Sequence, residues 1–147
     1  MKITICGSTA FISEMESLAK SLGDMGHEVQ FPPVHFEDNS GKLWHTKDYY
    51  KFKKTEPFND EDFKKTHAQR IRDHFDKVAW SEAVLVADYD KNNLPNYIGP
   101  NTLMEMGLAF HLGKKIYLLQ PIPNLQWKEE IVGLGPIVIS GDLGLIV

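Results

Sequence analysis

The chain has 147 residues, the usual size of one domain, and its 42% hydrophobic and 24% charged residues are typical of a globular protein. The net charge of −4 provides no basic field for long nucleic acid, and no apolar run is long enough to span a membrane. The one cysteine excludes an intramolecular disulfide and a cysteine-rich zinc site. Met1 leads directly into a strand-like run, so we expect a cytoplasmic protein.

Short apolar runs alternate with amphipathic segments along the chain. We predict strands over 2–6, 28–31, 83–88, 115–119 and 136–139, and helices over 13–25, 60–81 and 101–111, with a short helix near 127–130. Strands that are apolar throughout are buried on both faces, as in a parallel sheet. The sequence therefore predicts an α/β fold over 1–147: a single domain with a doubly wound, mostly parallel five-stranded sheet, Rossmann-like or flavodoxin-like. The pattern Ser13-x-x-Glu16 predicts a capping box at the start of the first helix.

The segment 32–59, after the second strand, does not fit this alternation, and a stretch of that length without clear structure is typical of a functional or mobile segment. It interleaves aromatic residues with lysines: Phe36, Trp44, Tyr49, Tyr50, Phe52 and Phe58 with Lys42, Lys47, Lys51, Lys53 and Lys54. Such a mixture could stack a base and neutralise a phosphate, as a lid over a ligand. The aromatic rings could equally pack on the domain or on a second subunit, and both interpretations stay open.

Two stretches should lie at the carboxyl ends of the strands, where open α/β sheets bind ligands. Gly7-Ser8-Thr9 follows the first strand, and its backbone and hydroxyl groups could contact a sugar or phosphate. It could also be a plain tight turn. Neither the G-x-G-x-x-G fingerprint nor the P-loop pattern is present, which argues against a nicotinamide oxidoreductase and a P-loop NTPase.

The second stretch leads to Glu105, which we expect in the first turn of a helix at the mouth of the sheet. A carboxylate there could attack an anomeric carbon. It could also form a capping box with Thr102, since acidic residues in first turns are common. The pattern alone leaves both interpretations open.

Three stretches, ICGS at 5–8, SEAVLVAD at 81–88 and NTLMEMGLA at 101–109, together resemble the nucleoside 2-deoxyribosyltransferase family and its relatives, the 2'-deoxynucleoside 5'-phosphate N-hydrolases. The stretch from Glu105 to Ala109 is similar to the family pattern Glu-x-Gly-x-Ala, whose glutamate is the nucleophile. The resemblance implies an enzyme without a cofactor. Glu105 would attack C1' of a (deoxy)ribonucleoside or its 5'-monophosphate and displace the base, and water or a second base would then accept the sugar.

Other residues could orient the nucleophile or bind the substrate. Asp88, after the third strand, is the candidate we favour for a catalytic role, although it could be an ordinary strand-end acid. Substrate-binding candidates in the following loop are Asp90, Asn96 and Asn101.

The sequence also departs from the family pattern. His74 stands where relatives carry an aspartate, beside Asp73, and both are candidate substrate contacts. Gly99 stands six residues before the nucleophile, where relatives hold a base or a phosphate. The arginine-containing turn of the hydrolases is missing after Ser8.

The six histidines show no paired-ligand spacing, so we expect no metal. The expected partner is a small nucleoside or nucleotide, not a long nucleic acid or a membrane, and the family resemblance implies a homodimer or larger homo-oligomer. Two alternatives remain. One is a non-catalytic nucleotide-binding or sensing module of the same fold, in which Glu105 only caps its helix. The other is a structural homo-oligomer with an aromatic interface.

Overall fold

The structure is a computed structural model that describes residues 1–53 and 60–147. Its main sheet has five strands, all parallel: β1 (Lys2–Cys6), β2 (Glu28–Gln30), β5 (Ala83–Val86), β6 (Lys115–Leu118) and β7 (Ile137–Val138). Their order is β2-β1-β5-β6-β7, which is the flavodoxin-like winding. The predicted doubly wound five-stranded sheet is therefore confirmed, and the order decides between the two windings that the sequence left open.

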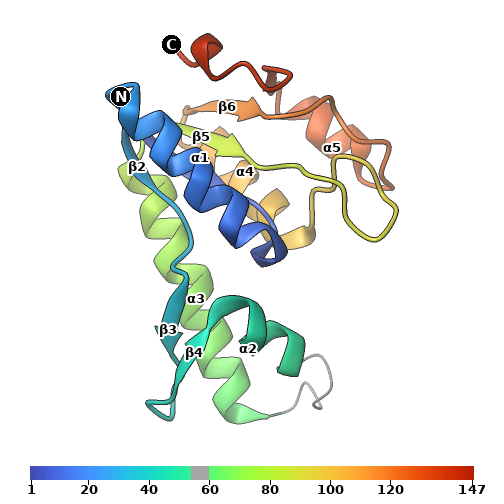
Figure 1. Cartoon of the computed structure of the whole chain (residues 1–147). Coiled ribbons are helices and arrows are strands. Elements are labelled where there is room, and N and C mark those ends of the chain that lie inside the picture. The colour runs from blue at the N-terminus through green and yellow to red at the C-terminus, as the bar shows by residue number, and fades with distance from the viewer. Residues whose placement is uncertain (54–59) are drawn as a thin grey trace.

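Helices cover both faces of this sheet (Figure 1). On one face lies α1 (Ile12–Asp24), whose buried residues share a core with Ile3 and Ile5 of β1. On the other face lie α3 (Glu61–Trp80), α4 (Pro100–His111) and α5 (Lys128–Gly133), which share a second core with Cys6. The alternation of side chains along β1 thus directs Cys6 toward α3 and α4.

The helix ends agree with the sequence in one case and differ in another. Asp60 caps α3, where its carboxylate accepts a hydrogen bond from the backbone N–H of Asp62, as the predicted range 60–81 requires. The capping box predicted at Ser13 is wrong. A 3-10 turn, η1 (Thr9–Phe11), already carries the chain into α1, so Ser13 lies inside the first turn, and Ser8 caps η1 instead.

The insertion after β2 is regular in its described part, contrary to expectation. It forms an antiparallel hairpin of β3 (His35–Glu37) and β4 (Leu43–His45), followed by α2 (Thr46–Lys53). Figure 1 shows these elements beside the N-terminal part of α3, which extends beyond the sheet. The backbone N–H of Asn39 donates to Thr66 Oγ1 of α3 at 2.8 Å, which ties the hairpin to that helix.

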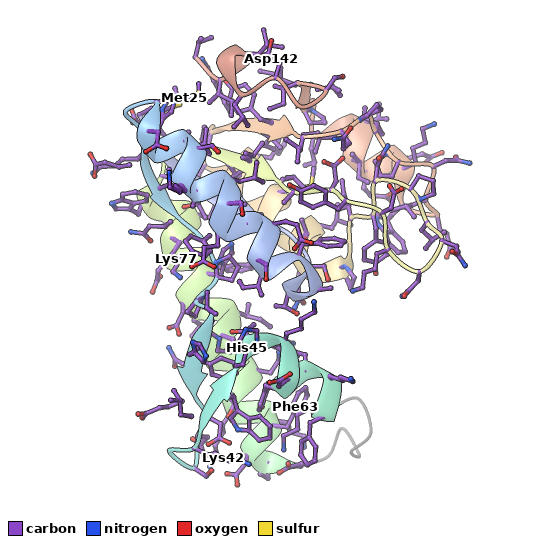
Figure 2. All side chains as sticks on the ribbon, viewed as in Figure 1. Met25, Lys42, His45, Phe63, Lys77 and Asp142 are labelled. Carbon is purple, nitrogen blue, oxygen red and sulfur yellow. The ribbon has the colours of Figure 1, made fainter. Side chains whose placement is uncertain are left out.

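A small aromatic core holds the insertion together. The fully buried ring of Tyr49 has its centroid 5.0 Å from Phe36, 5.5 Å from Trp44 and 5.2 Å from Tyr50. Figure 2 shows side chains of this region, His45 and Phe63 among them, gathered around α3 and away from the sheet. The interpretation that these rings pack on the protein is therefore confirmed for Phe36, Trp44, Tyr49 and Tyr50, whereas Phe52 is 47% exposed. Phe58 and Lys54 lie outside the described residues.

A short 3-10 turn, η2 (Leu143–Leu145), follows β7 near the C-terminus. The described helices include none that could cross a bilayer.

Candidate active site

A cavity of about 430 Å³ opens where the sheet meets the insertion. Its sheet wall is formed by the turn after β1, the loop after β5 and the first turns of α4. Its other wall is formed by α2 and the facing side of α3. This volume lies in the range typical of small-ligand sites, and the cavity lies at the carboxyl ends of the strands, as expected for this winding.

Gly7, Ser8 and Thr9 line the cavity at the end of β1. A Cβ atom on Gly7 would lie 3.1 Å from the carbonyl oxygen of Ala87, so a larger residue would require this backbone to shift by a few tenths of an ångström. Ser8 Oγ accepts hydrogen bonds from the backbone N–H of Ala10 at 3.3 Å and from Lys91 Nζ at 2.7 Å. With both acceptor positions used, the hydroxyl hydrogen is the part of Ser8 that can reach a ligand oxygen.

Glu105 lines the same cavity from α4. It lies in the second turn, because α4 begins at Pro100 behind the N-cap Gly99, so the expectation of a first-turn position and of a capping box with Thr102 is wrong. Its side chain is 13% exposed. Burial raises the pKa of Glu105 to about 8, although a hydrogen bond from the Cys6 thiol acts in the opposite direction.

His74, on α3, lies behind Glu105 and also lines the cavity. Its Nε2 is 3.6 Å from Glu105 Oε2, which would be an ion pair only if the imidazole were charged. Burial is the first cause that lowers the pKa of His74 to about 3, followed by the charges of Lys77 and Arg70. Between pH 3 and 8 both groups are therefore mostly neutral, and neither of these two atoms has a hydrogen-bond partner in the described structure.

The cavity brings together six of the ten candidate residues from the sequence: Gly7, Ser8, Thr9, His74, Asn101 and Glu105. The other four lie outside its lining. Asp88 is fully buried and accepts a hydrogen bond from the backbone N–H of Gln120 at 2.9 Å, which links the ends of β5 and β6. Its catalytic role stays a prediction.

The remaining three candidates make local contacts. Asp73 lies on α3, where it accepts a hydrogen bond from Gln69 and contacts Arg70. Asp90 accepts from the backbone N–H of Asn96, whose side chain donates to the Pro121 carbonyl. The bonds of Asp90 and Asn96 shape the loop after β5 beside the cavity.

Sequence reasoning missed several lining residues. Tyr50 and Lys53 belong to the aromatic and lysine mixture of the insertion, whereas His67, Arg70, Lys91 and Tyr97 were not among the candidate site residues. Gly99 was the one available signal for Tyr97: a Cβ atom at Gly99 would lie 3.2 Å from the Tyr97 ring, so this ring occupies the space that a side chain at position 99 would need.

The charge of the lining is opposite to that of the whole chain. Lys53, Arg70 and Lys91 line the cavity, and Glu105 is the acidic residue among its described lining. Because the pKa of Glu105 is about 8, this carboxyl group cancels little of the positive charge at neutral pH. A positive cavity in a chain of net charge −4 is suited to an anionic ligand.

No family model matches the chain, and no curated protein matches it. The solved structures that are similar to this chain include the following two. One is a 2-deoxyribosyltransferase from the psychrotolerant bacterium Bacillus psychrosaccharolyticus, with a TM-score of 0.47 and 15% identity, covering 80% of this chain and 71% of that chain. The other is a CMP N-glycosidase from Clostridium botulinum, with a TM-score of 0.42 and 16% identity, covering 80% of this chain and 70% of that chain. What the cavity can do follows from its own residues.

Proposed function

We propose that this protein is an enzyme that cleaves or transfers the N-glycosidic bond of a nucleoside or nucleotide, with Glu105 as the nucleophile. One observation carries the proposal: the carboxyl group of Glu105 and the Gly7-Ser8-Thr9 turn line one cavity. A substrate whose sugar or phosphate contacts the turn can therefore present C1' to the carboxylate. The resemblance in the stretch 101–109 implies the same role for Glu105.

The chemistry requires a carboxylate below the anomeric carbon. As the C–N bond breaks, the base leaves with the bonding electrons and takes up a proton, while C1' becomes cationic. Glu105 stabilises that charge and then bonds to C1', giving a glycosyl ester. Water hydrolyses the ester, or a second base displaces the carboxylate. Only the ionised form of Glu105 attacks, and this fraction increases as the pH approaches about 8.

We further propose that the preferred substrate carries a 5'-phosphate. Arg70 and Lys53 lie on the wall opposite the Ser8 turn, and Lys91 lies beside Ser8. Charge-assisted hydrogen bonds from such groups stabilise a phosphate more strongly than they stabilise a neutral hydroxyl.

The test is the release of free base, followed by chromatography, from separate ribo- and deoxyribonucleosides and their 5'-monophosphates, with and without an acceptor base. We expect release by the wild type and a loss of about a thousandfold or more in Glu105→Gln, because the amide cannot form the ester. Glu129→Gln, on an exposed position of α5, is the matched control and should keep full activity.

A folded wild-type protein that binds one of these nucleotides but releases no base would contradict the proposal. That outcome would favour the alternative of a non-catalytic sensing module. Release that persists in a folded Glu105→Gln protein would instead assign the chemistry to another residue.

A further inference from the structure

Three different metal-binding side chains converge behind the cavity. Cys6 ends β1, His74 lies on α3 and Glu105 lies on α4, and one ligand atom from each lies within 4.8 Å of the other two. Cys6 and His74 are buried, and Glu105 faces the cavity. The side chain of Cys6 lies on the face of the sheet that α3 and α4 cover, so these two helices and β1 hold the three groups together.

Two of these groups each have one buried atom that makes no hydrogen bond to the described residues. Glu105 Oε2 and His74 Nε2 have no partner in the described structure, although His74 is only 7% exposed. A buried nitrogen or oxygen without a hydrogen-bond partner destabilises the folded protein, because it has given up its hydrogen bonds to water. A cation between them would satisfy both atoms at once.

We propose that Cys6, His74 and Glu105 bind one Zn²⁺ ion, with the fourth coordination position open to the cavity. A thiolate, an imidazole and a carboxylate form the mixed sulfur, nitrogen and oxygen set that zinc accepts, whereas magnesium and calcium prefer oxygen ligands alone. Among the described residues no fourth side chain joins the group. Water therefore completes the tetrahedron.

One of the three distances between ligand atoms already fits a tetrahedral zinc site. Zinc bonds of about 2.0–2.3 Å place tetrahedral ligand atoms roughly 3.3–3.7 Å apart. The His74 Nε2 to Glu105 Oε2 distance is already 3.6 Å. The Cys6 backbone is fixed in the central strands, so side-chain rotations of His74 and Glu105 can close the site. Binding displaces the thiol proton, and the carboxyl proton where it is present, to the solvent.

The consequence for activity rests on the proposed function. A zinc ion on Glu105 occupies the carboxylate that would attack C1', so zinc and substrate exclude each other at this site. Zinc is therefore an inhibitor that a chelator reverses. The binding site itself follows from the three side chains, whatever the cavity does.

The test uses Co²⁺ as a spectroscopic probe of the metal-free full-length protein. Cys6 is the only cysteine of the chain, so a thiolate-to-cobalt charge-transfer band can come from no other residue of this protein. We expect one equivalent of Co²⁺ to give this band together with the visible bands of four-coordinate cobalt, and one equivalent of Zn²⁺ to remove them.

Two ligand variants and one control assign the ligands. Cys6→Ser and His74→Gln should each weaken zinc binding, measured against a competing chelator, by about tenfold or more, at least as much as the loss of an outer contact to a metal ligand. His45→Gln is the control, because His45 faces His35 on the β3–β4 hairpin, with ring centroids 5.1 Å apart, and such a pair is another place for zinc to bind. This control should bind zinc with unchanged affinity.

The proposal is overturned if the folded wild type gives no thiolate band, or if zinc binds equally well to wild type and to His74→Gln. It is also overturned if His45→Gln alone loses the metal. Where Cys6→Ser fails to fold, Glu105→Gln provides a further ligand variant. Because the spectra need no substrate, a protein that binds cobalt through Cys6 but releases no base would refute the proposed function and leave the zinc site intact.

Discussion

The two walls of the cavity differ in construction. The sheet wall is set by strands buried on both faces, with Ile5, Leu85 and Leu118 fully buried. The opposite wall depends on a hairpin and α2, held to α3 by an aromatic core around Tyr49. The sheet wall carries Glu105 and Ser8, whereas the opposite wall carries Arg70 and Lys53, with His74 on α3 closing the site behind Glu105.

The two walls therefore have different roles. A nucleophile must be held within a fraction of an ångström, which rigid parallel strands and a buried helix provide. Charge on the opposite wall acts over longer distances, and a smaller core is sufficient to hold it. We therefore expect changes in the sheet wall to affect the chemical step, and changes in the insertion to affect affinity.

The largest effect expected is on stability, and it distinguishes the aromatic core of the insertion from the core of the sheet. Tyr49→Ala removes a fully buried ring and should cost the insertion about 3–5 kcal/mol, while Leu85→Ala should cost the sheet about 2–5 kcal/mol. Hydrogen exchange measures both. Tyr49→Ala should expose the amides of α2, β3 and β4 and leave those of β1, β5 and β6 protected. Equal loss of protection across the sheet would show that the two regions unfold as one unit.

The next effect concerns Asp88, a carboxyl group of the sheet. Burial raises the pKa of Asp88 from 3.8 to about 7. Hydrogen bonds from the backbone, the first of them from Gln120, lower the pKa but do not outweigh burial. The native state therefore keeps this proton up to about pH 7, whereas the unfolded chain loses it near pH 3.8. As the pH increases between these values, ionisation of Asp88 stabilises the unfolded state and not the native state. The free energy of unfolding therefore falls by about 4 kcal/mol.

Asp88→Asn removes this dependence. The amide side chain keeps an acceptor oxygen for the backbone N–H of Gln120 and cannot ionise, so the variant should unfold like the wild type at about pH 4 and be more stable at about pH 8. Chemical denaturation at both pH values measures the difference. Equal stability of the two proteins at the higher pH would show that Asp88 titrates in the native state as it does in the unfolded chain. A selective loss of base release in this folded variant would support the catalytic role predicted for Asp88.

The sequence predicted the sheet wall better than the opposite wall for a physical reason. A strand buried on both faces needs a continuous apolar run, and a ligand turn directly follows it, so Gly7 and Ser8 could be found from one local pattern. Glu105 required the family resemblance, and even its position in α4 was displaced because Gly99 and Pro100 start the helix earlier.

Contacts between distant segments left no local pattern. Arg70 and His67 face the cavity because of how α3 rotates against α4, which the spacing of apolar residues in α3 did not determine. The convergence of Cys6, His74 and Glu105 joins three elements, so a search for paired ligands along the chain could not detect it. The aromatic residues of the insertion were noticed, but their hairpin was not, because each of its strands has only three residues.

A smaller effect tests the recognition role of the opposite wall. Arg70 lines the cavity, whereas Arg72, the other arginine of the chain, is exposed and lies outside that cavity. Arg70→Met should increase KM for a 5'-monophosphate by about 10- to 100-fold, because it removes one charge-assisted hydrogen bond to the phosphate. KM for the nucleoside should stay nearly unchanged. Arg72→Met should change neither. An equal loss on both substrates would assign Arg70 to folding or to the sugar.

The smallest effect expected belongs to the insertion and has the opposite sign to that of Asp88. Burial acts to raise the pKa of Asp38, but hydrogen bonds from the Ser40 hydroxyl, the Trp44 indole and the backbone outweigh it and lower the pKa to about 2. The carboxylate thus stabilises the hairpin above about pH 4, and this contribution is lost as the pH falls through about 2. Because Asp38 is close to solvent, we expect only about 1 kcal/mol.

The indole N–H of Trp44 reports this titration directly, since it donates to Asp38 Oδ2 at 2.9 Å. Its NMR resonance should shift with an apparent pKa of about 2 in the wild type and stay constant in Asp38→Asn. A shift that persists in the variant would assign the titration to another group. Between about pH 2 and 4 the insertion should therefore become more stable as the carboxylate of Asp38 forms, whereas between about pH 4 and 7 the sheet should become less stable around Asp88. Acid thus weakens one wall of the cavity and a rise toward neutral pH weakens the other, because the native state binds the proton of Asp38 less tightly, and that of Asp88 more tightly, than the unfolded chain does.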